Sequence, residues 1–259
     1  MRRAGLLALA ACAAATLALP PAVAASPSKQ PKKRPKPVVV QRGYSVIAVA
    51  RGPRVPVYAR PGAKKPLKTY RRPLHVRPRQ TFLVDWPHGR FTWPAWVRVH
   101  LPERPNGSTA WVRSSSVKFL LNPYRVHVDL LTHEMTVWRR GKVWMRVPIG
   151  VGRAATPTPQ GRYYLVKLIR PPNPRGAYGP YAFSVSAYSP VLTRFAGGPG
   201  QVGIHGTNRP HLVGKRVSHG CIRVDNAVIR RLARQLPLGT RVEIRWNTRP
   251  RGPSVTHAA

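Results

Sequence analysis

Acidic residues are scarce in this sequence. Six aspartates and glutamates stand against 45 lysines and arginines among 259 residues, which gives a formal net charge of +39. A balance this basic indicates an anionic partner, which would be nucleic acid for a cytoplasmic chain and cell-wall polymer or a membrane surface for an exported one. Because the arginines are spread over the whole chain, a solvated basic surface without a specific partner is the alternative.

Cysteine is nearly absent too, since Cys12 and Cys221 are the only two. Residues 1–25 have a basic start, an Ala/Leu-rich apolar run and the small-residue sequence AVAAS, a pattern typical of a secretory signal peptide. Cleavage would remove Cys12 and leave no stable membrane span, so the mature chain would hold one thiol and no internal disulfide. The alternatives are a retained anchor and lipid attachment at Cys12, which lies in the lipoprotein-like sequence LAAC.

The remaining sequence divides by composition into four parts. Residues 26–41 are basic and rich in proline, which predicts a disordered linker. Residues 42–121 contain short apolar runs with period-two alternation, broken by Pro and Gly, as in a small all-β unit. Residues 122–247 form a second, longer β-rich unit, and residues 248–259 read as a flexible tail.

Two Trp-Val pairs mark the end of the first β unit. Trp96-Val97 and Trp111-Val112 are separated by the turn-rich segment PERPNGS, which predicts two adjacent strands of a hairpin. Together with VPVYARPG, this segment resembles a bacterial SH3-like domain, which implies a small β-barrel. We expect the two tryptophans to pack in its core, with ligand stacking as the alternative.

The second unit begins with three predicted strands, whose turns fall at Thr132-His133 and Arg140-Gly141. A later strand has Phe183, Val185 and Ala187 on one face. These patterns predict a mainly β fold for this unit.

One convincing helix follows near the end of the chain, with Asp225 as its expected N-cap. Its apolar stripe consists of Val228, Ile229, Leu232, Ala233 and Leu236. A final strand, RVEIRW, places Val242, Ile244 and Trp246 on one face.

The neighbours of Cys221 indicate a reactive thiol. Gly220 allows a tight turn that would point backbone amides at a developing oxyanion, and the nearby helix N-terminus is expected to lower the thiol pKa. His205, His211 and His219 are close in sequence, and a histidine within reach would supply the base. Spacing alone favours His205 only slightly over His219.

The segments IHGTN and SHGCIRVDN, with PIGVG and TPTPQG upstream, resemble the catalytic signature of the L,D-transpeptidase family of YkuD type over residues 124–246. The resemblance implies a β-sandwich-like catalytic domain with one main helix after the nucleophile. It implies Cys221 as nucleophile, His205 as general base, and the Gly206 carbonyl as the group that orients the imidazole.

The resemblance also suggests supporting roles. Amides of Gly220 and Cys221 would form the oxyanion hole, with His219 as a further orienting candidate. Arg223 would position the substrate. Ser218 is grouped with Arg223 at the substrate, although its hydroxyl suits a loop-stabilising role better.

The implied activity is peptidoglycan L,D-transpeptidation, in which a tetrapeptide stem acylates the cysteine and a neighbouring stem takes the acyl group. It requires neither metal nor other cofactor, and no nucleic-acid partner is implied. Alternatives are an L,D-carboxypeptidase that uses water, a non-catalytic basic protein that binds wall polymers, and a zinc hydrolase built on the three histidines and Cys221. The scarcity of carboxylate bases argues against the zinc hydrolase.

Overall fold

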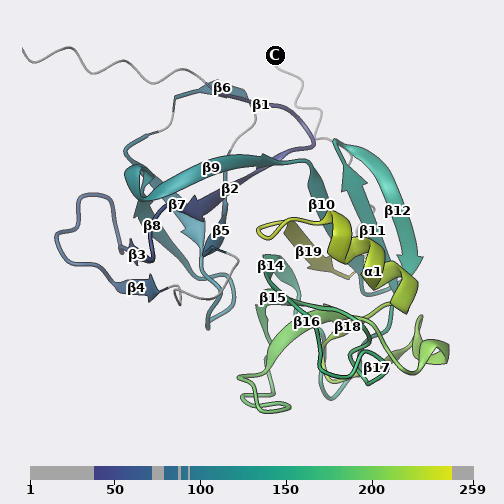
Figure 1. Ribbon diagram of the computed structural model, residues 1–259. Helices are drawn as coiled ribbons and strands as arrows, with labels where there is room; N and C mark the ends of the chain where they lie inside the picture. The colour runs from purple at the N-terminus through teal and green to yellow at the C-terminus, as the bar shows by residue number, and fades with distance from the viewer. Residues whose placement is uncertain (1–37, 72–78, 87–88, 93, 247–259) are drawn as a thin grey trace, which may run out of the picture. The chain divides into compact units, whose positions relative to one another are not determined.

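The computed structural model describes residues 38–71, 79–86, 89–92 and 94–246, all within one compact unit of the chain. The predicted signal peptide and tail, and most of the predicted linker, lie outside these residues. The described chain is mainly β, as predicted (Figure 1). Its first half contains β1 (Val38–Val40), β2 (Ser45–Ala50), β3 (Arg54–Val57), β4 (Lys68–Arg71), β5 (Thr81–Val84), β6 (Gly89–Phe91), β7 (Trp96–His100), β8 (Thr109–Arg113), the 3-10 turn η1 (Ser114–Ser116) and β9 (Val117–Asn122).

Five of these strands form one sheet in the order β8-β7-β5-β2-β9. Their alternating apolar residues are buried together, which gives this half of the chain its own core. The predicted hairpin of β7 and β8 is confirmed, with Val97 opposite Val112. The likeness to an SH3-like barrel stays a prediction.

Two details of this half differ from expectation. β1 lies in the range expected to be linker, yet it pairs with β6, and Val40 is buried. Trp96 and Trp111 are half-buried rather than in the core, because Val97 and Val112 occupy the inward-facing positions of the same strands.

The second half contains the remaining strands, β10 to β19, and the α-helix of the described chain. Its elements are β10 (Tyr124–Asp129), β11 (Glu134–Arg139), β12 (Lys142–Pro148), β13 (Val151–Gly152), β14 (Gly161–Ile169), β15 (Ala182–Tyr188), β16 (Gln201–His205), the 3-10 turn η2 (Pro210–Leu212), β17 (Arg216–Ser218), β18 (Ile222–Arg223), α1 (Asn226–Gln235) and β19 (Arg241–Arg245).

Eight of these strands form a sheet in the order β12-β11-β10-β19-β14-β15-β16-β18. The two predicted turns are present between β10, β11 and β12, where His133, Arg140 and Gly141 have positive φ. β18 pairs in parallel with β16 at the edge of the sheet, and this pairing positions the candidate site.

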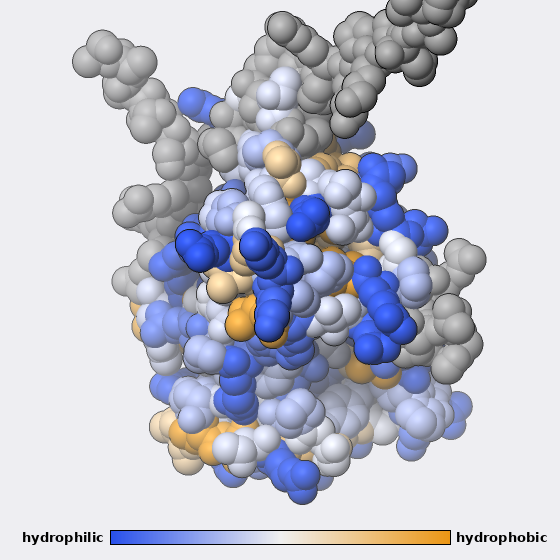
Figure 2. Space-filling view, turned by 90° about the vertical axis from the view of Figure 1, so that its left-hand side faces the viewer, coloured by the Kyte–Doolittle hydropathy of each residue, from blue (hydrophilic) through white to orange (hydrophobic). Residues whose placement is uncertain are grey.

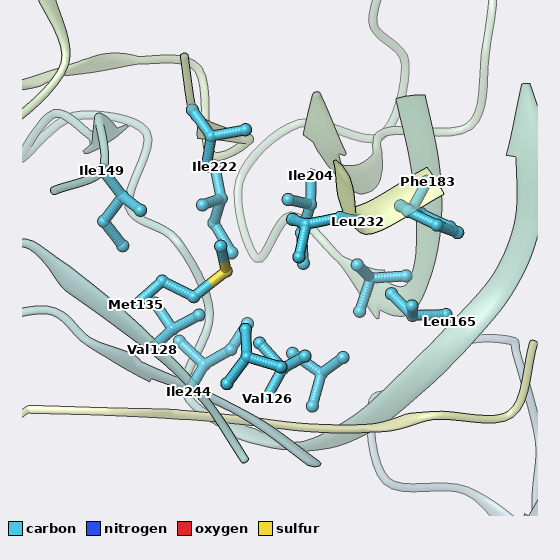
Figure 3. Packing of buried hydrophobic residues seen from close by; sticks show 14 of the residues in the cluster. Val126, Val128, Met135, Ile149, Leu165, Phe183, Ile204, Ile222, Leu232 and Ile244 are labelled. Carbon is cyan, nitrogen blue, oxygen red and sulfur yellow. The ribbon is translucent and has the colours of Figure 1, made fainter. Parts of the chain in front are cut away.

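A single apolar cluster fills this half. Figure 3 shows Val126, Val128, Met135, Ile149, Leu165, Phe183, Ile204, Ile222, Leu232 and Ile244 in it. The predicted inward face of β15 is confirmed, because Phe183, Val185 and Ala187 are buried. Trp246 was expected beside Val242 and Ile244, but it follows the end of β19 and is 39% exposed.

Helix α1 confirms its predicted start. The Asp225 side chain accepts a hydrogen bond from the Ala227 amide at 2.7 Å. Ile229, Leu232 and Leu236 are buried in the cluster of the sheet, which holds α1 against it (Figure 1). The helix therefore starts shortly after β18 and anchors the chain that carries Cys221.

The surface is largely hydrophilic. Figure 2 shows hydrophilic residues over most of the described part of one face, with smaller apolar patches between them. Within the described ranges, the structure contains no helix that is both long and apolar enough to cross a membrane.

Candidate functional site

Cys221 lies in the turn between β17 and β18. Gly220 before it has a φ of 110°, a conformation that side-chain-bearing residues rarely adopt, so the predicted glycine turn is present. The Ser218 hydroxyl closes this turn, because it donates to the Cys221 carbonyl at 2.5 Å and accepts from the Gly220 amide at 3.1 Å. The turn thus holds the backbone of Cys221 in one position.

The register of β16 and β18 brings His205 and Cys221 to the same face of the sheet. Ile204 pairs with Ile222, and both side chains are buried in the apolar cluster. Residues on either side of a buried position in a strand point to the opposite face. His205 at the end of β16 therefore shares a face with Arg223, its partner in the register, and with Cys221 just before β18.

The orientation of the His205 ring is fixed by the backbone. Its Nδ1 lies 2.6 Å from the Gly206 carbonyl oxygen. A carbonyl can only accept, so Nδ1 carries the proton and Nε2 of the neutral ring is left as a proton acceptor. The structure therefore places the Gly206 carbonyl where the sequence resemblance expected it.

Asn226, the first residue of α1, holds the chain beyond His205. Its side chain accepts from the Thr207 amide at 2.9 Å and donates to the Thr207 carbonyl at 2.9 Å. A β-carbon at Gly206 would collide with the Asn226 side chain, so this position requires glycine. Asn226 was not predicted from the sequence, because its role depends on the packing of α1.

Burial sets the charge state of both candidate groups. It lowers the pKa of His205 to about 4, although the bond to Gly206 acts in the opposite direction. Burial likewise raises the pKa of the Cys221 thiol, while a hydrogen bond from the Gly203 backbone and the charge of Arg223 lower it by less. The resting pair at neutral pH is therefore a neutral imidazole and a neutral thiol.

The expected lowering of the thiol pKa by the helix N-terminus is wrong. α1 begins after Cys221, but the carboxylate of Asp225 caps its first turn. Burial of the thiol raises its pKa and outweighs the hydrogen bond from the Gly203 backbone and the charge of Arg223, which both lower it.

Arg223 lies directly opposite His205 in the parallel register. Its Nε is buried and has no hydrogen-bond partner among the described residues. Its positive charge also lowers the pKa values of Cys221 and His205. A guanidinium with an unsatisfied donor beside a thiol is suited to hold a carbonyl or carboxylate of a ligand.

Two expected roles are changed by the contacts in the turn. Ser218 is only 1% exposed and its hydroxyl is used within the turn, so it is a structural residue and not a substrate contact. The Gly220 amide donates to Ser218 and is already engaged. Of the two expected oxyanion donors, we retain the Cys221 amide as the candidate.

His219 is held by an aromatic contact and lines the cavity beside Cys221. Its ring stacks on Phe195, with centroids 5.0 Å apart and an angle of 30° between the planes. His211 lies in η2. In the described chain, His, Cys, Asp and Glu side chains form no group of three or more that could hold a metal.

The segment TPTPQG stabilises the turn that carries Cys221. The Thr156 hydroxyl donates to the Ser218 carbonyl at 3.1 Å, and the Gly152 amide donates to the Thr158 hydroxyl at 2.9 Å. A side chain at Gly152 would collide with this backbone. TPTPQG thus packs against the turn that carries Cys221, although Thr156 and Ser218 are 62 residues apart in sequence.

The six acids of the chain are used elsewhere. Asp129 and Asp225 accept hydrogen bonds from nearby backbone amides. The others contact basic side chains in the pairs Lys68–Glu103, His100–Asp85, Arg146–Glu134, Arg162–Asp85, Arg162–Glu243 and Arg241–Glu243. The charged side chain that acts on the Cys221 thiol is the cation Arg223.

A small cavity opens beside Cys221. Its lining consists of Ser189, Leu192, Phe195, Gly200, Gln201, Val202, His219 and Cys221. The Tyr178 ring lies edge-on to the His205 ring, with the two ring centroids 4.9 Å apart. Tyr178 and Phe195 were not predicted from the sequence, where their only signal is an aromatic residue in a glycine-rich loop.

Comparison with known proteins identifies the second half of the chain. Residues 123–244 match the profile of the YkuD family, the L,D-transpeptidase catalytic domain. The chain is 39% identical to the Bacillus licheniformis protein YkuD, assigned as an L,D-transpeptidase, over 47% of this chain and 66% of that protein. It is 34% identical to YqjB of Bacillus subtilis, with the same assignment, over 48% of this chain and 71% of that protein.

A weaker likeness is found among solved structures. The catalytic domain of an L,D-transpeptidase from E. faecium, solved by NMR, is 27% identical with a TM-score of 0.35, over 47% of this chain and 96% of that one. The sequence match to YkuD spans 66% of that relative's length. Residues 38–122 precede the matched family domain.

Proposed function

The chain belongs to the L,D-transpeptidase family, and from this premise we propose that it is a peptidoglycan L,D-transpeptidase that uses Cys221 as its nucleophile. The observation that carries the proposal is the shared register of β16 and β18. It brings His205, Arg223 and Cys221 to one face of the sheet, with the His205 ring oriented by Gly206.

In the first step, the thiol of Cys221 attacks the carbonyl carbon of the third residue of a tetrapeptide stem. His205 Nε2 takes the thiol proton as the carbon–sulfur bond forms, which suits a pair that is neutral at rest. The Cys221 amide stabilises the oxyanion. Collapse of the tetrahedral intermediate breaks the bond to D-alanine, whose amine receives the proton from His205. A thioester between Cys221 and the stem remains.

In the second step, a side-chain amine on the third residue of a neighbouring stem attacks the thioester. His205 accepts the amine proton, the carbon–sulfur bond breaks, and the proton returns to the thiolate of Cys221. The product is a cross-link between two third residues. Arg223 would hold an acidic or carbonyl group of the stem through its guanidinium.

Three features outside the site belong to the same proposal. Residues 1–25 would direct export, so the protein would act in the cell wall or an equivalent extracytoplasmic space. The excess of basic residues would favour anionic wall polymers as a second partner. The first half would serve as an SH3-like module attached to the catalytic domain.

The experiment is incubation of the purified protein with disaccharide tetrapeptide fragments, followed by mass spectrometry. A dimer whose mass equals that of two substrates minus one D-alanine molecule supports transpeptidation. Accumulation of tripeptide stems without dimers indicates water as acceptor and a carboxypeptidase. If wild type does not turn over the fragments, and wild type and Cys221→Ala bind cell wall equally, the protein is a non-catalytic wall-binding protein.

A further inference from the structure

The loop between β7 and β8 holds the loop between β15 and β16. Arg104 Nη1 donates to the Ser189 carbonyl at 2.8 Å, and Nη2 donates to the carbonyls of Leu192 at 2.9 Å and Pro199 at 3.2 Å. These carbonyls belong to the outgoing and the returning arm of residues 189–200. One guanidinium therefore ties both arms together.

A second set of contacts secures the start of the same loop. The Asn106 side chain donates to the Tyr188 carbonyl at 2.8 Å and accepts from the Tyr188 amide at 2.8 Å. The Tyr188 hydroxyl donates to the Pro102 carbonyl at 2.7 Å. The Arg104 guanidinium lies over the Tyr188 ring, 5.1 Å from its centroid. The β7–β8 loop thus bonds both backbone groups of Tyr188, beyond the point where the pairing of β15 with β14 ends at Val185.

The loop that is held forms one wall of the candidate site. Ser189, Leu192, Phe195 and Gly200 all line the cavity beside Cys221. Phe195 stacks on His219, which lines the same cavity. The position of residues 189–200 therefore decides the shape of the space in front of the thiol.

This loop has few stabilising contacts of its own. Its internal backbone bonds include one from the Ser189 amide to the Gly200 carbonyl at 2.8 Å and a reciprocal pair between Phe195 and Gly198 at 2.9 Å. Val191 is 53% exposed and Phe195 is 38% exposed, so little apolar packing fixes the tip. Segments with few buried apolar contacts open at low free-energy cost unless other bonds restrain them.

We propose that Arg104 is a positioning residue for acyl transfer, which fixes residues 189–200 so that they wall the Cys221 cavity and hold the peptide stem there. This inference rests on the proposed function for its substrate. It assigns the first half of the chain a direct part in the shape of the site, through the β7–β8 loop. Asn106 supports the same loop from its first end, through its two bonds to Tyr188 at the end of β15.

The test compares Arg104→Ala with Arg113→Ala in the full chain. Arg113 is also an exposed arginine of the first half, but its guanidinium lies over the Tyr58 and Trp96 rings, so its loss removes the same charge away from the loop. For Arg104→Ala we expect faster amide hydrogen exchange confined to residues 188–200. We also expect kcat/KM for the stem to fall about 10- to 100-fold, mostly through KM, since misplaced binding groups cost rates of this order.

Alkylation of Cys221 by iodoacetamide is the internal control, because this small reagent does not need the loop to be bound. Its rate should be no lower than in wild type, because a displaced loop exposes the thiol whereas a damaged thiol site would slow the reaction. Asn106→Ala should change exchange and KM in the same direction by less. Arg104→Lys has one terminal nitrogen in place of the two through which Arg104 donates, so its exchange rates and KM should lie between those of wild type and Arg104→Ala.

Unchanged exchange in residues 188–200 of Arg104→Ala would overturn the inference. So would faster exchange with unchanged kinetics for the stem, or equal effects in Arg113→Ala. If wild type fails to turn over stems, the proposed function is lost. The exchange measurement then still decides whether Arg104 holds the loop beside Cys221.

Discussion

His205 and Arg223 are register partners on two parallel strands, β16 and β18. Their side chains therefore share the face that also carries Cys221, and the Arg223 charge lowers the pKa values of both the imidazole and the thiol. A cation in this position disfavours the protonated imidazole and favours the thiolate. Arg223 thus acts on the charge states of the pair as well as being available to a ligand.

Replacement of Arg223 should separate these two effects. In Arg223→Ala, loss of the charge should move the pH midpoint of Cys221 alkylation upward, whereas Arg223→Lys should keep it near wild type. Turnover of stems should fall in both variants by about 10- to 100-fold, because a charge-assisted bond to substrate contributes about 1.5–3 kcal/mol. An unchanged midpoint in the alanine variant would contradict the electrostatic role.

The roles of Cys221 and His205 predict a ranking of variants. Cys221→Ser should abolish cross-linking without loss of folding, because the same imidazole cannot activate a hydroxyl of much higher pKa. His205→Ala should lose activity by about 10²–10⁴-fold. His219→Ala should lose less, since its ring stacks on Phe195. Steady-state rates and circular dichroism of the three variants test this ranking, and a more severe loss in His219→Ala would reverse the assignment of the base.

The raised thiol pKa predicts slow alkylation of the resting protein at neutral pH. Since burial is the largest influence on Cys221, the rate should rise with a midpoint above the ordinary value of about 8.5. The synthetic peptide RVSHGCIRVD provides the control, because it has the same neighbours but no fold. A midpoint below that of the peptide would indicate a thiolate–imidazolium pair at rest and refute the neutral pair.

Local features of this fold were predictable from sequence because neighbouring residues determine them. The N-cap forms between Asp225 and the amide of Ala227, only two residues later. The shared face of Phe183, Val185 and Ala187 follows from the two-residue period of a strand. The glycine before Cys221 likewise indicated a tight turn, and its φ is positive.

Features that depend on distant contacts were not predictable in this way. The thiol pKa depends on how deeply the turn is buried, and Trp246 is exposed because β19 ends one residue before it. The role of Arg104 depends on a loop more than 80 residues away, and the separation of 85 residues from Ser189 gives no local signal. In a chain with so many arginines, nothing in the sequence distinguishes this one.

The lowered pKa of His205 predicts that the folded protein becomes less stable in mild acid. Its pKa is about 4 in the fold against 6.5 for an ordinary histidine, so the unfolded chain takes up a proton first as the pH falls. The contribution of His205 to the free energy of unfolding should be fully present when the pH is above the pKa of the unfolded chain. It should decrease as the pH falls from that pKa to the pKa of the folded protein. The decrease from this one residue should be about 3 kcal/mol.

Urea unfolding at several pH values, with wild type and His205→Asn side by side, measures this contribution. The variant lacks the titrating ring, so its free energy of unfolding should depend less steeply on pH over the same interval. Some dependence should remain, because burial also lowers the pKa of His127. Equal slopes in the two proteins would mean that His205 is not held neutral in the fold, and the general-base role would then lack the charge state on which it depends.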